Sequence, residues 1–423
     1  MKIDTICVQE GYNPKNGEPR VLPIVQSTTF KYDSSDFMGA LFDLKEEGFF
    51  YTRLGNPTTD AVEKKIAALE GGVGALLTAS GQSASLFSVI NICHAGDHLI
   101  CSAAVYGGTY NLFYKTTKEL GIDVTFVPCN LKAAELEQYF KPNTKCVFGE
   151  TLSNPSLDIL DIEEFAKAAH AHGVPLIVDN TFPTAINCRP FEFGADIVTH
   201  STSKYMNGQA NALGGVVVDS GNFDWTNGKF PMLVEPDESY HGISYVKTFG
   251  KAAYITKMRT HLMRDIGATP APMNAWLLNL GLETLSLRVK KHCENAQKVA
   301  EYLQSELGNK ITWINYPDLE GNPNNELCKK YLPNGSSGVI SFGVKGGRDA
   351  ATKFMDNLKL AAVVTHVADA RTCVLHPAST THRQMSDEQL LECGVKPDLI
   401  RFSVGIEDAE DIIEDIKQAL YHD

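Results

Sequence analysis

The stretch VPLIVDNTFPTAINCRPFEFGADIVTHSTSKYMNG, residues 174–208, decides the fold. Its two short apolar runs, PLIVD (175–179) and DIVTH (196–200), are typical of buried strands, and the chain between them is long enough for a crossover connection. Strands joined in this way lie parallel, and their carboxyl ends meet at one edge of the sheet. Asp179 ends the first run and Lys204 follows the second. The sequence therefore predicts that both side chains face one site.

The same pattern continues on both sides of this stretch. Short apolar runs alternate with helical patterns, which indicates an α/β fold with a mostly parallel sheet and helices on both faces. The other runs are GALLTA (74–79), DHLIC (97–101), DVTFV (123–127), KCVFG (145–149) and GGVVV (214–218). Ligands of such sheets bind at the carboxyl ends of the strands, so the residues that follow these runs are the candidates for a site.

The chain divides into three predicted regions. Residues 1–55 are rich in Gly, Pro and polar residues, and we expect them to form an irregular N-terminal arm. Residues 56–260 are expected to form the large domain, in which the stretch at about 219–260 is predicted as a long loop. Residues 261–423 are expected to form a smaller C-terminal α/β domain that begins with one long helix at about 271–305.

Composition argues against several kinds of partner and site. The chain has a formal net charge of -13 and no basic run with interleaved aromatic residues, so we expect neither nucleic acid nor an anionic membrane as partner. It begins with no apolar signal segment and contains no apolar run long enough for a bilayer, so we expect a cytoplasmic protein. The 10 cysteines are scattered, which favours reduced thiols and no metal site.

The pair of Asp179 and Lys204 suits pyridoxal phosphate (PLP). A lysine amine forms a Schiff base with an aldehyde, and an aspartate can hold a protonated pyridine nitrogen so that the ring acts as an electron sink. Taken alone, an Asp at a strand end is more often a turn cap, and a Lys in a loop is more often a solvated surface residue. The interpretation therefore depends on what lies at the other strand ends.

Residues at the other strand ends favour the cofactor. Hydroxyls and backbone N–H groups at a helix start suit a phosphate, an aromatic ring can stack on a pyridine, and an amide can bond the ring hydroxyl. The candidates are Gly81, Gln82, Ser201 and Ser203 for the phosphate, Tyr106 for the ring and Asn154 for the hydroxyl. A tight turn, core packing and an Asn-Pro turn are the simpler explanations of Gly81, Tyr106 and Asn154. Neither a P-loop nor a G-x-G-x-x-G motif occurs, so a nucleotide is the weaker candidate.

The ordered motifs resemble the Cys/Met-metabolism family of PLP enzymes. The motifs are YTRLGNPT, SGQSA, VYGGTY, ETLSNPS, VDNTF and THSTSKYMNG, and the similarity continues to LIRFSVGIED near the C-terminus. The resemblance implies the type I PLP-dependent transferase fold, with Lys204 as the Schiff-base lysine and proton carrier. It implies Asp179 as the partner of the ring nitrogen, and Tyr106 as the stacking residue that also assists the leaving group.

The resemblance also implies residues for a neighbouring subunit and for the substrate. Tyr51 and Arg53 of the arm would reach the partner's phosphate in a homotetramer of two dimers with shared active sites. Arg401 would bind the substrate's α-carboxylate, a task suited to a guanidinium group. Arg371 and Thr372, which stand where cystathionine synthases and lyases commonly have Glu-Ser, are expected near the substrate. A surface ion pair is the simpler interpretation of Arg371.

Within the family, three features resemble the O-acetylhomoserine sulfhydrylases: the insertion at about 219–260, the run DIGATPAPMNAWLLNLGLETLSLRV and the Arg371-Thr372 pair. The expected reaction converts O-acetyl-L-homoserine and sulfide, or methanethiol, into L-homocysteine and acetate by γ-replacement. Gly108 disfavours methionine γ-lyase, which typically has a cysteine at that position. Cystathionine γ-synthase, a methionine or cystathionine γ-lyase and a PLP-binding module without catalysis are the alternatives. The preferred acyl group, the thiol donor and the role of Arg371 stay open.

Overall fold

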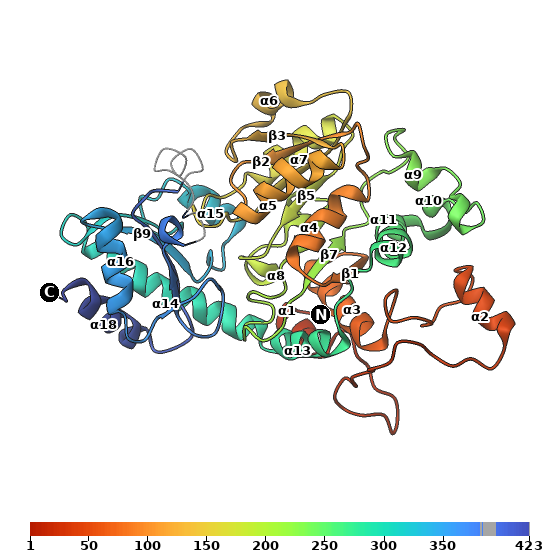
Figure 1. The fold of residues 1–423 in the computed structure, drawn as a ribbon, viewed down its shortest axis with the longest axis horizontal. Helices are drawn as coiled ribbons and strands as arrows, with labels where there is room; N and C mark the ends of the chain where they lie inside the picture. The colour runs from red at the N-terminus through yellow and green to blue at the C-terminus, as the bar shows by residue number, and fades with distance from the viewer. Residues whose placement is uncertain (381–382, 384–394, 423) are drawn as a thin grey trace.

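Seven strands form the larger sheet, in the order β1-β7-β6-β5-β4-β2-β3. The computed structural model describes residues 1–380, 383 and 395–422 of the chain, and Figure 1 shows this sheet beside a smaller one. The strands are β1 (Gly74–Thr78), β2 (His98–Ser102), β3 (Asp123–Val127), β4 (Thr144–Glu150), β5 (Leu176–Asp179), β6 (Ile197–His200) and β7 (Gly215–Asp219). Strand β7 runs antiparallel to both neighbours, and the pairs from β6 to β3 are parallel. The predicted mostly parallel sheet of an α/β fold is confirmed.

Helices precede or connect these strands, and several of them pack against the sheet. They are α3 (Pro57–Glu70), α4 (Gly81–Ile90), α5 (Gly107–Asn111), α6 (Ala133–Leu136), α7 (Ile162–Ala171) and α8 (Thr184–Asn187). Helix α4 packs against β6 and β7, and α7 packs against β4 and β5. Because β1 and β6 are both antiparallel to β7, they run in the same direction. Helix α4, which follows β1, therefore begins at the edge where β5 and β6 end.

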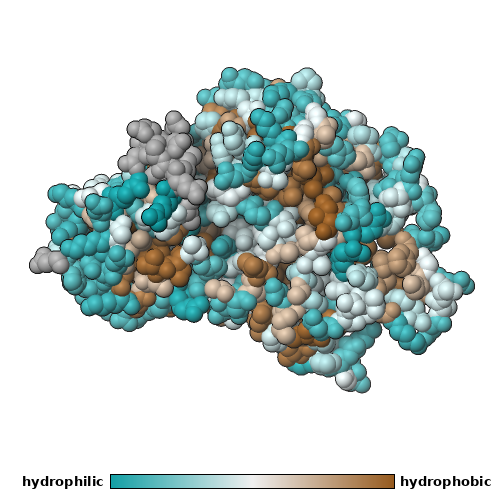
Figure 2. All heavy atoms as spheres, in the orientation of Figure 1, coloured by the Kyte–Doolittle hydropathy of each residue, from teal (hydrophilic) through white to brown (hydrophobic). Residues whose placement is uncertain are grey.

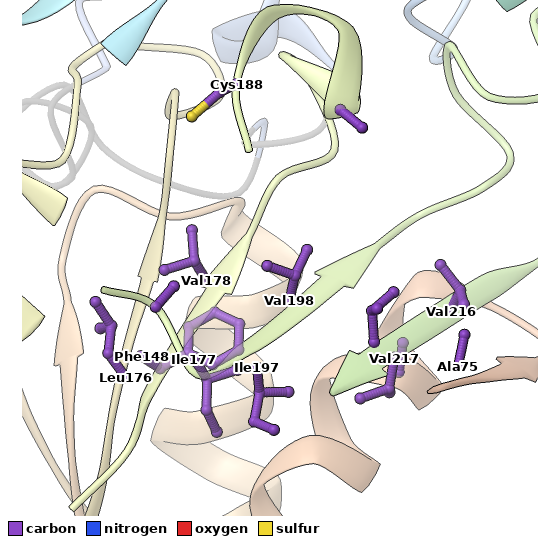
Figure 3. Packing of buried hydrophobic residues seen from close by; sticks show 14 of the residues in the cluster. Ala75, Phe148, Leu176, Ile177, Val178, Cys188, Ile197, Val198, Val216 and Val217 are labelled. Carbon is purple, nitrogen blue, oxygen red and sulfur yellow. The ribbon is translucent and has the colours of Figure 1, made fainter. Parts of the chain in front are cut away.

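The sheet is a rigid platform because its interior is apolar and closely packed. Every residue of β2, β6 and β7 is buried. Figure 3 shows Ile177 and Val178 of β5 beside Val198 of β6, and Val216 and Val217 of β7. Removal of such apolar surface from water is the main favourable contribution to folding, at about 25 cal/mol per Å². The strand ends are thereby held in fixed relative positions.

Five strands form the smaller sheet, in the order β10-β11-β12-β9-β8. They are β8 (Ile311–Asn315), β9 (Val339–Val344), β10 (Ala362–Val363), β11 (Cys373–Leu375) and β12 (Leu399–Ser403), and their helices are α15 (Asn325–Tyr331), α16 (Gly347–Asn357) and α18 (Ala409–Leu420). Its apolar core begins at Ala296, in the helix that connects it to the larger sheet. The predicted smaller α/β unit near the C-terminus is confirmed, and it is coloured blue in Figure 1.

The prediction of one long helix at about 271–305 is wrong, because the helix is broken. Helix α13 (Pro272–Glu283) and helix α14 (Leu285–Ser305) meet at Thr284, whose φ of -109° and ψ of 8° leave the helical conformation. The Arg288 guanidinium donates to the Gly281 carbonyl oxygen at 2.6 Å and to the Thr284 hydroxyl at 3.1 Å. These bonds satisfy the end of α13, so the chain turns there without a large loss of hydrogen bonding.

Helical segments also occur where the sequence predicts irregular chain. The arm contains α1 (Ile3–Gln9) and α2 (Ser35–Phe42), and the predicted long loop and its end contain α9 (Pro231–Val234), α10 (Tyr245–Phe249), α11 (Ala253–Lys257) and α12 (Arg264–Ile266). Helix α1 packs against α3, α13 and α14. Helix α2 is capped by Ser34, whose hydroxyl accepts a hydrogen bond from the Phe37 N–H, and the helix stands away from the body of the molecule in Figure 1.

Figure 2 shows a largely polar surface on which apolar side chains are gathered in separate patches. The arm is one source of exposed apolar side chains, because α2 leaves Phe37, Met38 and Phe42 more than two-fifths exposed. Among the described helices, none combines the length and the apolar character needed to cross a membrane.

The contact of α13 with the loop after Lys204 predicts a stability effect. A Cβ atom added at Gly281 would lie 2.4 Å from the Asn207 carbonyl oxygen and 2.5 Å from that of Met206. Because backbone atoms cannot move aside cheaply, we expect Gly281→Ala to lower the free energy of unfolding by about 1–3 kcal/mol. Urea unfolding measures this change. Gly39→Ala in α2 is the control, because nothing lies within 4 Å there, and an equal loss in both variants would contradict the prediction.

Candidate active site

A cavity of about 420 Å³ opens at the carboxyl ends of the larger sheet and extends to the smaller one. Most of the sequence-predicted residues line it, from the ends of five strands of the larger sheet and from β12. They are Gly81, Gln82, Tyr106, Asn154, Asp179, Ser201, Ser203, Lys204 and Arg401. The expectation that these residues lie together holds for all nine, although their contacts alone do not assign a role to any of them.

Lys204 lies in the loop that follows β6, partly buried in the cavity wall. The loop is closed by hydrogen bonds from the Lys204 N–H to the Ser201 carbonyl oxygen at 3.2 Å and from the Gly208 N–H to the Lys204 carbonyl oxygen at 2.8 Å. Burial lowers the pKa of the Lys204 amine to about 8, and the positive charge of Arg401 contributes in the same direction. A neutral amine, which can act as nucleophile or base, is therefore available near neutral pH.

Asp179 is the last residue of β5, and its carboxylate is fixed by Thr181. The Thr181 N–H donates to it at 2.9 Å and the Thr181 hydroxyl at 2.5 Å. Burial raises the pKa of Asp179, and the hydrogen bonds from Thr181 oppose this rise because they stabilise the anion. The Thr181 hydroxyl also accepts from the Ser201 N–H at 2.9 Å. The aspartate is thus connected to the loop that carries Lys204.

The start of α4 forms a close-fitting cradle beside this loop. A Cβ atom at Gly81 would lie 2.6 Å from the Ser201 Cβ, so glycine alone permits this approach. The Gln82 side-chain oxygen is buried and has no hydrogen-bond partner among the described residues. Ser203 also lines the cavity, but its hydroxyl accepts from the Gly214 N–H at 3.0 Å. Free N–H groups at a helix start and a nearby hydroxyl suit a phosphate.

Arg401, on β12, brings a buried positive charge to the cavity. Its guanidinium donates to the Asn154 side-chain oxygen at 3.3 Å and to the carbonyl oxygens of Thr365 and His366 at 3.2 and 3.0 Å. Its Nε is buried without a partner, and it forms no ion pair with any described residue. Burial lowers the pKa of Arg401. A buried guanidinium that lacks a carboxylate partner is suited to an anionic ligand.

Four predicted residues do not line the cavity of their own chain. The Arg53 guanidinium lies over the Tyr51 ring, 5.1 Å from its centroid. Arg371 is largely exposed and pairs with Asp369 at 2.9 Å. This is the surface ion pair that the simpler interpretation of Arg371 predicts. Thr372 is buried, and its hydroxyl donates to the Glu407 carboxylate at 2.8 Å. The substrate and cofactor roles of these four residues stay predictions.

Sequence reasoning did not single out several residues of the cavity. Glu150 ends β4 within the quoted motif ETLSNPS, so its position at a strand end was a usable signal. Thr181 follows Asp179 closely and was equally accessible to that reasoning. His366 enters from the smaller sheet, and burial lowers its pKa to about 4, so its ring is neutral. Its place in the cavity depends on how the two sheets pack, which no local pattern reveals.

Comparisons with known proteins show what the chain is similar to. The family model described as Cys/Met metabolism PLP-dependent enzyme matches residues 4–421. An O-acetyl-L-homoserine sulfhydrylase of Leptospira meyeri is 43% identical over 99% of this chain and 97% of its own length. A homocysteine synthase of Schizosaccharomyces pombe is 44% identical over 99% and 98%. A crystal structure from Campylobacter jejuni, which contains a pyridoxyl-lysine monophosphate, matches with a TM-score of 0.95 and 37% identity over 99% of this chain and 100% of the other.

The environment of Lys204 predicts an unusual pH dependence of its reactivity. In protein prepared without ligand, we expect an acylating reagent to modify Lys204 half-maximally near pH 8, because burial and Arg401 favour the neutral amine. Peptide mass spectrometry measures the modification, and Lys31, which is exposed, is the internal reference. Arg401→Met should move the midpoint upward. A midpoint near the ordinary lysine value of 10.5 that does not respond to this substitution would contradict the prediction.

Proposed function

Because the chain belongs to the Cys/Met metabolism family of PLP-dependent enzymes, as its motifs predict, we propose that it is an O-acetylhomoserine sulfhydrylase. It catalyses γ-replacement on O-acetyl-L-homoserine with sulfide as the nucleophile, and it releases L-homocysteine and acetate. The observation that carries the proposal is the cavity that unites Lys204, Asp179 and Arg401. The names of the full-length relatives support the choice of substrate.

The residues of the cavity fit PLP. Lys204 would hold its aldehyde carbon, Asp179 its ring nitrogen and Tyr106 one face of its ring. The cradle at Gly81 and Gln82, closed by Ser201, would hold its phosphate, since a side chain at Gly81 would fill that space. Asn154 would bond the ring hydroxyl, and Ser203 would contact the phosphate. When bound, the cofactor supplies an electron sink that stabilises negative charge on the substrate's α-carbon.

Lys204 moves protons in the proposed reaction. Its Nζ, neutral in part near pH 8, takes the proton from the substrate's α-carbon. After that proton has been passed on, the amine removes a proton from the β-carbon, which allows acetate to leave from the γ-carbon. The Tyr106 hydroxyl, on a side chain that is 48% exposed, lies at the cavity and assists the departing acetate. The pocket thereby keeps a single base close to successive carbons of one bound substrate.

Arg401 orients the substrate. Its guanidinium binds the α-carboxylate, and its bonds to Asn154 and to the carbonyl oxygens of Thr365 and His366 hold it in one orientation. The planar fork of an arginine can form two parallel hydrogen bonds with a carboxylate. Because Lys204 and Arg401 line the same cavity, a substrate whose carboxylate is bound by Arg401 would be held in the cavity that contains the Lys204 amine.

The arm supports an oligomer with shared active sites. We assign the protein to homotetramers of two dimers in the cytoplasm, in which Tyr51 and Arg53 contact the phosphate in the partner's cavity. These residues lie outside the cavity of their own chain, and α2 carries exposed apolar side chains away from the body. The nine described cysteines are free, as is usual in a reducing compartment.

Replacement of Lys204 tests the proposed reaction. We expect Lys204→Ala to lower kcat for homocysteine formation from O-acetyl-L-homoserine and sulfide at least roughly 100-fold, because no other lysine lines the cavity among the residues that the structure describes. Lys31→Ala, on the surface, is the control. A parallel assay for α-ketobutyrate from methionine distinguishes the γ-lyase alternative. Full turnover by Lys204→Ala, or methionine cleavage that exceeds sulfhydrylation in the unaltered enzyme, would refute the proposal.

Mixed oligomers test the shared site. Lys204→Ala and Arg53→Gln should each be nearly inactive alone. When the two are unfolded together and refolded, random pairing restores one complete site in half of the dimers, so we expect about a quarter of the normal activity. Steady-state assays on the refolded mixture measure the recovery. If the mixture stays as inactive as its components while refolded unaltered enzyme recovers fully, Arg53 does not serve the partner's site.

A further inference from the structure

Glu150 is a buried acid of the cavity that the proposed reaction does not use. It is the last residue of β4, it is 5% exposed, and it lines the cavity. In the parallel pairing of β4 and β5 it lies directly opposite Asp179. It forms no ion pair with any described residue. A buried carboxyl group without a cation beside it carries a large cost when it is ionised.

Glu150 holds the segment that carries Tyr106. One oxygen of its carboxyl group accepts a hydrogen bond from the Tyr106 backbone N–H at 2.6 Å. Tyr106 is the residue that precedes α5, and no side chain caps the start of that helix. The bond from the strand end therefore holds the backbone from which the Tyr106 side chain extends to the cavity lining. This bond links the backbone of Tyr106 directly to the end of β4.

Two carboxyl groups so close together in a buried site do not both ionise. Asp179 receives two hydrogen bonds from Thr181, which favour its anion, whereas Glu150 receives one, from Tyr106. Burial, and next the charge of Asp179, raise the pKa of Glu150 well above its ordinary value. Among the described residues, Cys101 on β2 also interacts with Glu150, and it is itself buried with a raised pKa and therefore neutral. The proton of the pair accordingly belongs to Glu150.

We propose that Glu150 is a positioning residue that works as a neutral carboxylic acid. Its acceptor oxygen places Tyr106 over the cavity, and its proton leaves Asp179 as the single anion beside the cofactor's ring nitrogen. An ionised Glu150 would repel the Asp179 carboxylate and favour protonation there, which would remove the partner of the ring nitrogen. The effect of Glu150 on catalysis rests on the proposed function, whereas its protonation state does not.

The first experiment compares two substitutions of similar volume in the holoenzyme. Glu150→Gln keeps a hydrogen-bond acceptor and is always neutral, so we expect its kcat/KM and its retention of PLP on dialysis to stay within about threefold of the unaltered enzyme. Glu150→Leu removes the acceptor, so we expect kcat/KM to fall roughly tenfold to a hundredfold and PLP to dissociate faster. Equal behaviour of the two variants would overturn the positioning role.

The second experiment measures the protonation state without turnover. In the full chain free of cofactor, the unfolded state loses the Glu150 proton above pH 4.5, while the folded state keeps it, so rising pH destabilises the unaltered protein. Glu150→Gln has no proton to lose at this position, so its stability does not fall with pH for this reason. We expect its melting temperature to match that of the unaltered protein near pH 5 and to exceed it by at least about 2 °C at pH 8. A difference that does not change with pH would overturn the neutral state.

Infrared spectroscopy and a matched control complete the test. The difference spectrum of the unaltered protein minus Glu150→Gln should contain the C=O stretch of a protonated carboxyl group at pH 7.5, and its absence would overturn the proposal even if Glu150→Leu failed to fold.

Asp219→Asn is the control, because Asp219 is a buried acid with a pKa raised to about 7, outside the cavity. It should change the pH dependence of melting but not kcat/KM. If sulfhydrylation is absent from the unaltered enzyme, the function fails while both measurements on the cofactor-free chain still decide the state of Glu150.

Discussion

The Thr181 hydroxyl joins the two residues on which the site depends. It donates to the Asp179 carboxylate at 2.5 Å and accepts from the Ser201 N–H at 2.9 Å. The first bond orients the acid, and the second fixes the start of the loop that carries Lys204. Since Asp179 pairs with Thr199 across β5 and β6, neither strand can shift its register without breaking these bonds. The acid and the amine therefore keep one spacing, which a ring held between them requires.

The loop after Lys204 is supported from behind by the junction of α13 and α14. Arg288 donates to the Tyr205 carbonyl oxygen at 2.7 Å, and Gly281 allows α13 to approach the carbonyl oxygens of Met206 and Asn207. The two contacts come from opposite sides of the break at Thr284, since Gly281 belongs to α13 and Arg288 to α14. The interruption that separates the two helices is thus part of the scaffold that holds the lysine.

What the sequence predicts well is local, and what it misses depends on tertiary contact. The strand-end positions of Asp179 and Lys204 follow from hydrophobic runs and crossover length alone, so the edge of the sheet could be predicted without the resemblance. The break at Thr284 could not, because the bonds that satisfy the end of α13 come from Arg288 in the next helix. Arg401 and His366 lie in the smaller sheet or its loops, and only the packing of the two sheets brings them to the cavity. Their placement required either a family resemblance or the structure.

Burial explains how an acidic protein binds anionic ligands. The chain carries a formal charge of -13, yet Lys204 and Arg401 face the cavity, and neither forms an ion pair with a described residue. Desolvation makes both cations costly, which lowers the pKa of each, and an arriving carboxylate or phosphate relieves that cost. The burial that lowers the pKa of Lys204 therefore also favours an anionic ligand in the cavity.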